Sequence, residues 1–332
     1  MFLVRNFIAL SLAASFNLLA QPSVLAVVNA ASFQSGLPAG GALATAYVTG
    51  LTALTAGTYL APPSQPLPYK LGGITVTIDN DYAPLLAVVV SSDPMAAAQV
   101  NFQVPLSANA SLLYQYVQAG PTYLGGFVVS DGVNKAMPTT TLTTSGLPDW
   151  GGFFSGVNGY AIAVHTSDST PVTSENPAQA GEPIIAYADG FFTTWPRPLI
   201  GLPTPPQVNF QPDYSLIASP GYLYLQSYPQ AGCPPAAGQC PGTGSITNTP
   251  ALKVTFMGLA TGVVGVEAIG FVVPSNQQTG NWALFFNQGS CPDGSGIPGT
   301  CGATFGSSSP FVLLPVRPEA HSSGQPDVEL RE

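Results

Sequence analysis

The sequence predicts an all-β protein, and three observations support this prediction. Short runs of β-branched and aromatic residues recur along the 332-residue chain, and turn residues separate nearly all of them. Outside the N-terminus, no window longer than about ten residues has a clean helical period. The 36 Gly and 34 Pro are typical of a chain with many turns. Many short strands with regular turn signals favour β-sandwiches or barrels.

Composition excludes several classes of protein. Lys and Arg total 7, too few to neutralise the phosphates of a nucleic acid. A hydrophobic content of 45% with 7% charged residues excludes a disordered chain and a charged helical bundle. The formal net charge of −9 indicates solubility rather than a particular partner.

The N-terminus predicts a secretory signal peptide. Arg5 supplies a basic start, and residues 7–20 are almost wholly apolar. This run falls short of the ~20 residues that span a bilayer, which disfavours the alternative of a membrane anchor. We therefore expect a secreted or cell-surface protein with no membrane span in the mature chain.

Two cleavage points remain open for this signal peptide. A cut after Ala20 places bulky Leu18 at the third position before the cut, whereas a cut after Ala26 places the smaller Val24 there. We favour Ala26.

Strand signals then follow in order. Ile74–Ile78 alternates strictly, Asp79-Asn80-Asp81 interrupts it, and Tyr82–Val90 resumes, which predicts a hairpin because Asn and Asp tolerate a positive φ. Ca²⁺ coordination by these carboxylates is the alternative, although the spacing of an EF-hand is missing. The other expected strands are Ala42–Val48, Ala98–Val104, Ser111–Val117, Gly126–Val129, Ala161–His165, Ile184–Ala188, Leu252–Phe256, Val266–Val273, Trp282–Asn287 and Phe311–Val316.

The chain also resembles itself. A Gly, Tyr, Gly pattern around Tyr47 recurs around Tyr187, an offset of 140 (187 − 47). A Phe-x-Val-Pro pattern ending the later strand recurs at an offset of 169 (271 − 102). Between them, residues 74–78 are matched with residues 252–256. The sequence thus predicts one strand-rich unit used twice, with coincidence among generic strand patterns as the alternative.

Four cysteines, an even number in an exported chain, predict disulfide bonds. Three pairings are possible, and we favour Cys233–Cys240 with Cys291–Cys301, each closing a Gly/Pro-rich loop. Zinc is disfavoured because the spacing is too wide and no His lies nearby.

Several motifs resemble the Solibacter-type uncharacterised C-terminal domain family. They are Val27-Val-Asn-Ala-Ala-Ser-Phe33-Gln-Ser-Gly36, Leu71-Gly-Gly-Ile-Thr-Val, Val100-Asn-Phe-Gln-Val-Pro105, Asn176-Pro-Ala-Gln-Ala-Gly181 and Tyr187-Ala-Asp-Gly190. The resemblance implies a secreted, Ig-like β-sandwich protein of acidobacterial type, and it carries over no catalytic residue. The opening is also similar, more weakly, to IPT/TIG domains.

These observations together predict two tandem Ig-like β-sandwich domains after a signal peptide. We expect the signal peptide at 1–26, the first sandwich at 27–147, the second at 148–316 and a disordered polar tail at 317–332. A Pro/Gly-rich insertion of the second sandwich, at about 196–250, holds two of the cysteines.

Residues for catalysis are scarce. His165 and Asp168 lie close in sequence, but no Ser stands in the setting that a catalytic triad needs. The sequence therefore predicts no catalytic residue, no metal ligand and no cofactor.

Aromatic residues beside flexible neighbours are the candidates for binding a ligand or partner, because an exposed ring stacks on sugars or protein surfaces. Packing in the core or between domains is the alternative. The candidates are Trp150, Phe153, Phe154, Trp195, Tyr222 and Tyr224.

The function predicted from these features is that of a secreted, non-catalytic surface or matrix protein. It would bind polysaccharide or a surface protein, or associate with itself, and would bind no nucleic acid. A secreted polysaccharide hydrolase and a purely structural spacer are the alternatives.

Overall fold

Every regular element of the described residues is a β-strand, which confirms the all-β prediction. The computed structural model describes residues 22–62, 66–93, 95–106, 122–123, 126–138, 143–144, 151–156, 158–191, 194–212, 221–227, 251–288 and 311–318. The strands are β1 (Ser23–Asn29), β2 (Leu43–Thr49), β3 (Gly57–Leu60), β4 (Thr75–Ile78), β5 (Asp81–Ala83), β6 (Leu85–Val90), β7 (Ala98–Gln103), β8 (Thr122–Tyr123), β9 (Val128–Ser130), β10 (Lys135–Pro138), β11 (Thr143–Thr144), β12 (Gly152–Phe153), β13 (Ala163–His165), β14 (Ala178–Gln179), β15 (Pro183–Asp189), β16 (Thr194–Trp195), β17 (Gln211–Pro212), β18 (Gly221–Ser227), β19 (Lys253–Leu259), β20 (Glu267–Val272), β21 (Gly280–Gln288) and β22 (Val312–Arg317). These residues include no helix long and apolar enough to cross a membrane.

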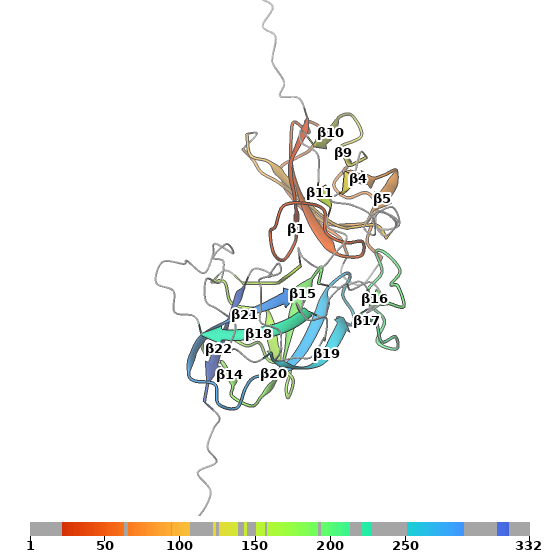
Figure 1. Ribbon diagram of the computed structural model, residues 1–332. Helices are drawn as coiled ribbons and strands as arrows, with labels where there is room; N and C mark the ends of the chain where they lie inside the picture. Colours follow the sequence, from red (N-terminus) through yellow and green to blue (C-terminus); the bar gives the residue numbers. More distant parts are fainter. Residues whose placement is uncertain are drawn as a thin grey trace, which may run out of the picture.

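The strands gather in two lobes (Figure 1). The first lobe comprises the described residues from 22 to 138, and the second lobe comprises those from 151 to 318. Each lobe has its own cluster of buried apolar side chains, between Val24 and Ala136 in the first and between Phe153 and Val316 in the second.

The first lobe is built on a nine-stranded sheet in the order β3-β6-β7-β2-β1-β10-β9-β4-β5. Strand β1 joins the two parts of this sheet, β3-β6-β7-β2 on one side and β10-β9-β4-β5 on the other. It pairs antiparallel with β2 and parallel with β10. Its register shifts between Val24 and Ala26. Side chains of both parts, such as Phe102 from β7 and Val129 from β9, meet in one core.

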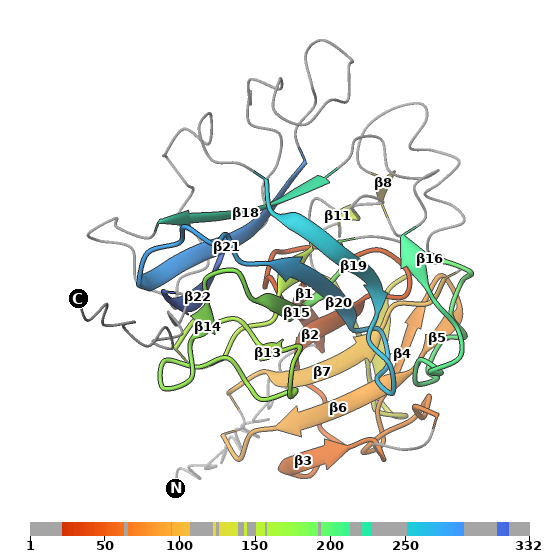
Figure 2. The same ribbon diagram turned by 90° about the horizontal axis from the view of Figure 1, so that it is seen from below.

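The second lobe has a five-stranded sheet, in which β12-β15-β20-β19 are neighbours and β13 also pairs with β15. It also has a four-stranded sheet in the order β14-β22-β21-β18 and a two-stranded sheet of β16 and β17. Figure 2 shows β19 and β20 side by side in this lobe, and β3, β6 and β7 side by side in the first.

The same pairings occur in both lobes. In the first, β2 pairs with β7 and β7 with β6; in the second, β15 pairs with β20 and β20 with β19. A parallel pair also occurs in each lobe, β1 with β10 and β14 with β22. Strands β2 and β15 are offset by 140 residues and β7 and β20 by 169, the offsets at which the sequence repeats itself.

One correspondence taken from the sequence was wrong. Residues 74–78 were matched with 252–256, but β4 pairs with β5 and β9, whereas β19 pairs with β20. Strand β19 of the second lobe corresponds instead to β6 of the first, because β19 pairs with β20 as β6 pairs with β7. Generic strand alternation could not distinguish these two positions.

The predicted turn is confirmed, but the strand expected after it at Tyr82–Val90 is divided: Asp81–Ala83 forms β5 and pairs with β4, whereas Leu85–Val90 forms β6 and pairs with β3 and β7. Strands β4 and β5 pair through Ile78 and Asp81, and the two residues between them, Asp79 and Asn80, have φ values of 50° and 72°. Two successive residues with positive φ make the turn type that matches the twist of a hairpin. The expected strand at 111–117 lies outside the described residues.

The preferred cleavage point after Ala26 falls inside strand β1. Strand β1 begins at Ser23, and Val24 is 2% exposed within the core of the first lobe. A cut after Ala26 would remove half of the strand that joins the two parts of the sheet. The alternative cut, after Ala20, leaves the strand whole.

Candidate functional site

Five strand ends meet where the two lobes touch, and each contributes a polar group. The residues are Asn29 at the end of β1, Leu43 at the start of β2, Gln103 at the end of β7, Asp189 at the end of β15 and Glu267 at the start of β20. The side chains of Asn29, Gln103, Asp189 and Glu267 are all at most 3% exposed. We call these five residues the junction cluster.

Asp189 connects the lobes directly. Its Oδ1 accepts a hydrogen bond from the backbone N–H of Leu43 at 2.8 Å, and its Oδ2 accepts one from Nδ2 of Asn29 at 2.9 Å. The Oδ1 of Asn29 in turn accepts the backbone N–H groups of Ala31 and Ser32, each at 2.8 Å. The Asn29 side chain is thereby fixed in the orientation that serves Asp189.

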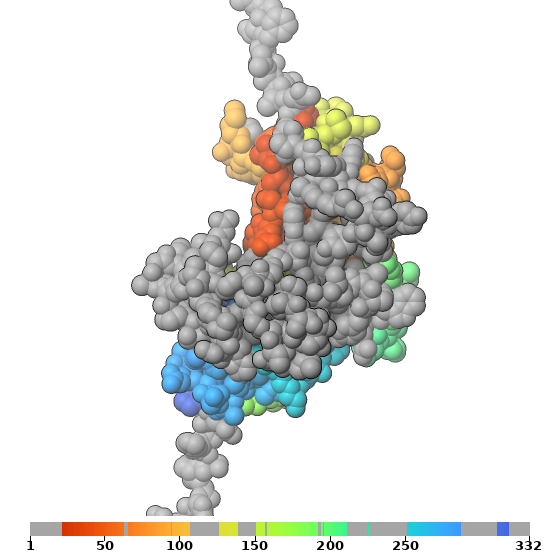
Figure 3. Space-filling view, in the orientation of Figure 1, coloured from red at the N-terminus to blue at the C-terminus, as the bar shows by residue number. Residues whose placement is uncertain are grey.

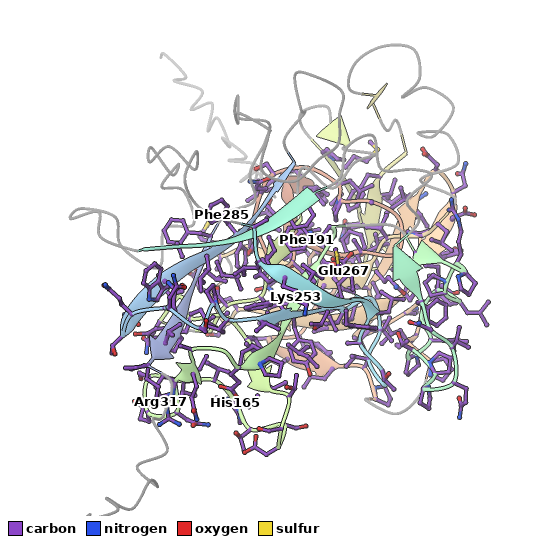
Figure 4. All side chains as sticks on the ribbon, turned by 60° about the horizontal axis from the view of Figure 1, so that its bottom comes forward. His165, Phe191, Lys253, Glu267, Phe285 and Arg317 are labelled. Carbon is purple, nitrogen blue, oxygen red and sulfur yellow. The ribbon has the colours of Figure 1, made fainter. Side chains whose placement is uncertain are left out.

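Glu267 is the cross-strand partner of Ala188, the residue that precedes Asp189. Its Oε2 accepts the backbone N–H of Phe191 at 3.0 Å, and Figure 4 shows the two labelled residues close together in the interior. Burial, and then the negative charge of Glu267, raise the pKa of Asp189 well above its ordinary value of 3.8. The hydrogen bonds from Leu43 and Asn29 act in the opposite direction and are outweighed.

Gln103 makes a second bridge between the lobes. Its Nε2 donates to the carbonyl oxygen of Gly41 at 2.8 Å, and its Oε1 accepts the N–H of Gly201 at 2.7 Å. The carbonyl oxygen of Gly201 accepts the N–H of Leu67 at 2.7 Å. The described part of the predicted insertion therefore packs against the first lobe.

A small hollow borders the junction cluster. It offers about 20 Å³, room for about one water molecule, and is lined by Leu106, Thr194, Arg197, Gly265 and Glu267 among others. Asp189, which is fully buried with both oxygens occupied, is not open to a substrate there.

A second polar set lies on the outer face of the first lobe. Along β7, Val100 and Phe102 point into the core, so Gln99, Asn101 and Gln103 lie on the opposite face of the strand. Gln99 and Asn101 are half-buried, whereas Gln103 continues the row into the junction. Tyr47 of β2 stands opposite Gln99, and Thr45 stands opposite Asn101.

The side-chain amides of Gln99 and Asn101 form only some of the hydrogen bonds that they could make. Oδ1 of Asn101 accepts hydrogen bonds from Thr45 Oγ1 at 2.8 Å and from Gln99 Nε2 at 3.0 Å. Within the residues that the structure describes, the Asn101 Nδ2 and the Gln99 Oε1 have no protein partner. Val89 of β6, 36% exposed, lies opposite Gln99 on its other side. We call Tyr47, Val89, Gln99 and Asn101 the amide face.

The second lobe has no such face at the equivalent positions. The offset of 169 places Ala268, Gly270 and Val272 of β20 where β7 has Gln99, Asn101 and Gln103. Tyr187 takes the place of Tyr47, is likewise half-buried, and stands opposite Ala268. The two lobes share the tyrosine and differ in the amides.

His165 has two partners that sequence proximity did not indicate. It is 5% exposed; its Nδ1 lies 2.6 Å from Glu182 Oε1, and its Nε2 lies 3.2 Å from the Asn176 carbonyl oxygen. Asp168 instead accepts hydrogen bonds from the N–H and hydroxyl of Thr170, which lower its pKa. In Figure 4 His165 lies away from Glu267, so it takes no part in the junction cluster.

Two of the six candidate aromatic side chains are described. Phe153 is 1% exposed and packs edge-on against Phe191 with ring centroids 5.1 Å apart, so its ring belongs to the core and is not available to a ligand. Phe154 is half-buried. Trp150 and the side chains of Trp195, Tyr222 and Tyr224 lie outside the described part of the chain, as do Cys233, Cys240, Cys291 and Cys301.

No family model and no curated protein matches the chain. Among solved structures, it is similar to SGBP-B of the Bacteroides ovatus mixed-linkage glucan utilization locus in complex with a mixed-linkage heptasaccharide, at 7% identity over 90% of this chain and 61% of that one, with a TM-score of 0.21. It is also similar to an endo-fucoidan hydrolase of glycoside hydrolase family 107, at 12% identity over 73% of this chain and 23% of that one, with a TM-score of 0.15. At these TM-scores neither likeness carries an argument about this chain.

Proposed function

We propose that the protein is a secreted, non-catalytic binding module that holds a neutral, hydroxyl-rich polysaccharide on the amide face. The observation that supports this function is the row of outward amides beside Tyr47. Asn101 offers amide donors and Gln99 offers a carbonyl acceptor, the two roles that sugar hydroxyls complement. A tyrosine ring beside them supplies the apolar surface on which a sugar ring stacks.

The charge of the face favours a neutral ligand. Tyr47, Val89, Gln99 and Asn101 include no side chain that is ionised near neutral pH. Asn101 Nδ2 and Gln99 Oε1 would each gain a hydrogen bond to the ligand. No charged side chain of the face would have to lose its water on binding. This is the chemistry of polysaccharide rather than of an anionic or cationic polymer.

We also propose that each lobe is an Ig-like β-sandwich domain. In the first lobe β1-β2-β7-β6 and β4-β9-β10 have the neighbours of an Ig-like sandwich with sheets ABED and CFG. In the second lobe β15-β20-β19 and β18-β21-β22 correspond to strands B, E, D and C, F, G. The alternative of a hydrolase is disfavoured because Asp189 is fully buried in the junction cluster and both of its carboxylate oxygens accept hydrogen bonds from the protein.

Affinity electrophoresis of the purified chain in gels containing soluble β-glucan, xylan or galactomannan tests the function. We expect at least one polysaccharide to retard the protein, and expect Tyr47→Ala and Asn101→Ala to weaken that binding by about tenfold or more, about 1.4 kcal/mol.

Tyr187→Ala is the matched control, because Tyr187 has the same place in the second lobe but faces Ala268 instead of an amide. It should bind as the unchanged protein does. Failure of all three polysaccharides to retard the protein, or equal loss of binding in Tyr187→Ala, would contradict the proposal.

A further inference from the structure

Outward-facing residues of the first lobe form a row that crosses five neighbouring strands, in the order β3-β6-β7-β2-β1 (Figure 2). The cross-strand pairs that make up this row are Thr58 with Val89, Val89 with Gln99, Gln99 with Tyr47, and Tyr47 with Ala26. Three of these residues belong to the amide face. Since neighbouring strands lie about 4.8 Å apart, the row is about 19 Å long.

The β-bulge of β1 adds an exposed side chain at one end of this row. The register passes from Val24–Val48 to Ala26–Tyr47, so Leu25 is the extra residue of the bulge. Leu25 is 56% exposed, whereas Val24 is buried in the core. A bulge often re-aims a side chain in this way. We call Thr58, Val89, Gln99, Tyr47, Ala26 and Leu25 the cross-strand row.

The cross-strand row is open at both ends, whereas the path along β7 is closed. Thr58 at one end and Leu25 at the other are exposed. One step along β7 toward the junction, Thr45 lies opposite Asn101 and is 3% exposed. Gln103 at the end of the strand is 1% exposed and bonded on both sides. A long ligand on the amide face therefore has room across the strands and none along β7.

The side chains of the row suit a chain of several neutral sugar rings. Tyr47 and Leu25 offer apolar surface, Gln99 Oε1 offers an acceptor near the middle, and the Thr58 hydroxyl both donates and accepts at the far end. None of the six side chains is ionised near neutral pH. The length of the row exceeds that of a single sugar ring, so a longer ligand makes more contacts.

We propose that the polysaccharide lies in an extended form across the strands, along the cross-strand row, and that its class is a linear, unbranched, neutral chain bound through internal sugar residues. Because both ends of the row open to solvent, the chain continues past Thr58 on one side and past Leu25 on the other. This inference rests on the proposed function and deepens it, since it adds the direction of the ligand and two contact residues outside the amide face.

Ligand-observed NMR titration of the full chain, which measures weak as well as tight binding, tests the inference with linear cello-, xylo- and manno-oligosaccharides. We expect the affinity to rise from the disaccharide to the hexasaccharide in at least one series. Thr58 lies three strand spacings, about 14 Å, from Tyr47, beyond the reach of a disaccharide stacked on that ring. Thr58→Ala should therefore weaken hexasaccharide binding by about fivefold and leave disaccharide binding unchanged. Tyr47→Ala should weaken both.

Ile162→Ala is the matched control for Leu25→Ala. Ile162 is 47% exposed, and its carbonyl oxygen accepts the N–H of Tyr187, so it is an exposed aliphatic residue beside the equivalent tyrosine of the second lobe. Leu25→Ala should weaken hexasaccharide binding by about fivefold, because the sugar loses apolar contact area. Ile162→Ala should bind as the unchanged protein does.

The outcomes separate this inference from the proposed function. An affinity that does not depend on length, unchanged hexasaccharide binding in Thr58→Ala, or equal weakening in Leu25→Ala and Ile162→Ala would overturn the inference and leave the proposed function in place. Retardation by a polysaccharide without binding of any linear oligosaccharide would do the same. The absence of binding to every oligosaccharide and polysaccharide would overturn both.

Discussion

Asp131 and Asp189 are both buried carboxylates that accept backbone hydrogen bonds, yet their pKa values move in opposite directions. Burial raises the pKa of Asp131, but hydrogen bonds from Asn134, Val133 and Ala53 outweigh it and hold the pKa at about 2. Asp189 has fewer donors and a negative neighbour. The number of donors and the presence of Glu267 decide which form each carboxyl prefers.

Asp131 makes the protein sensitive to acid. Its pKa is lower in the folded than in the unfolded protein, so its stabilisation is complete above about 3.8 and is lost as the pH falls toward about 2. A shift of this size corresponds to at most about 2 kcal/mol, and screening by nearby solvent reduces it to about 1 kcal/mol. We expect Asp131→Asn to lower the free energy of unfolding by that amount near neutral pH.

Chemical denaturation between about pH 2 and about pH 7 measures this effect. The difference between Asp131→Asn and the unchanged protein should shrink as the pH falls. The exposed Asp81→Asn serves as the control. A difference that stays constant down to the lowest pH would show that the charge of Asp131 is not what stabilises its loop.

At the scale of elements, β7 links the two polar regions of the molecule. Gln99 and Asn101 lie on the amide face, and Gln103 at the end of the same row bridges Gly41 and Gly201. Strand β2 does the same, since its Tyr47 belongs to the amide face while the N–H of its Leu43 donates to Asp189. In the space-filling view β1, in red, reaches the surface of the first lobe (Figure 3).

The lobes also meet through close backbone contacts. A Cβ atom added to Gly152 of β12 would lie 2.6 Å from Ser32 Cβ and 2.8 Å from Ser32 Cα. Because backbone cannot give way as a flexible side chain does, we expect Gly152→Ala to destabilise the protein by about 1–3 kcal/mol and to lower its Tm by several degrees.

Gly156→Ala is the control for this substitution, because the nearest atom to its added Cβ is 3.9 Å away. Calorimetry of both variants checks the prediction. Equal Tm values for Gly152→Ala and Gly156→Ala would mean that the contact with Ser32 adjusts freely.

Local patterns predicted the elements better than the site. Alternation and Asp79-Asn80 predicted the β4–β5 hairpin because both signals act within a few residues. The Asp189–Glu267 pair could not be found in this way, since 78 residues separate its members (267 − 189) and only the pairing of β15 with β20 brings them together. The amide row is visible as Gln99-x-Asn101-x-Gln103, but its exposure depends on which face of β7 meets the core.

At the scale of the whole molecule, the fold bears on how an exported chain would be processed. The sequence favours a cut after Ala26 because Val24 is smaller than Leu18 and Gln21-Pro22 interrupts a helix just before it, signals that are local and carry no information on the strand. Val24 is buried and pairs with Val48 and Pro138, contacts that require the folded first lobe.

We therefore expect that, if a signal peptide is removed from this chain, the mature protein begins at Gln21. N-terminal sequencing of protein recovered from the medium of an expressing culture measures this directly. A start at Val27 would contradict the expectation. As a control, a chain that begins at Val27 should have a lower Tm than one that begins at Gln21, because it lacks half of β1.

The parallel pairs β1–β10 and β14–β22 have a mechanical consequence. In each lobe an early strand lies alongside a late one, joined at Ser23–Met137 and Val24–Pro138 in the first and at Ala178–Val316 and Gln179–Arg317 in the second. Tension applied along the polypeptide would draw the two members of such a pair in opposite directions. Their hydrogen bonds would then be sheared together instead of peeled apart singly, so both lobes are built to resist pulling.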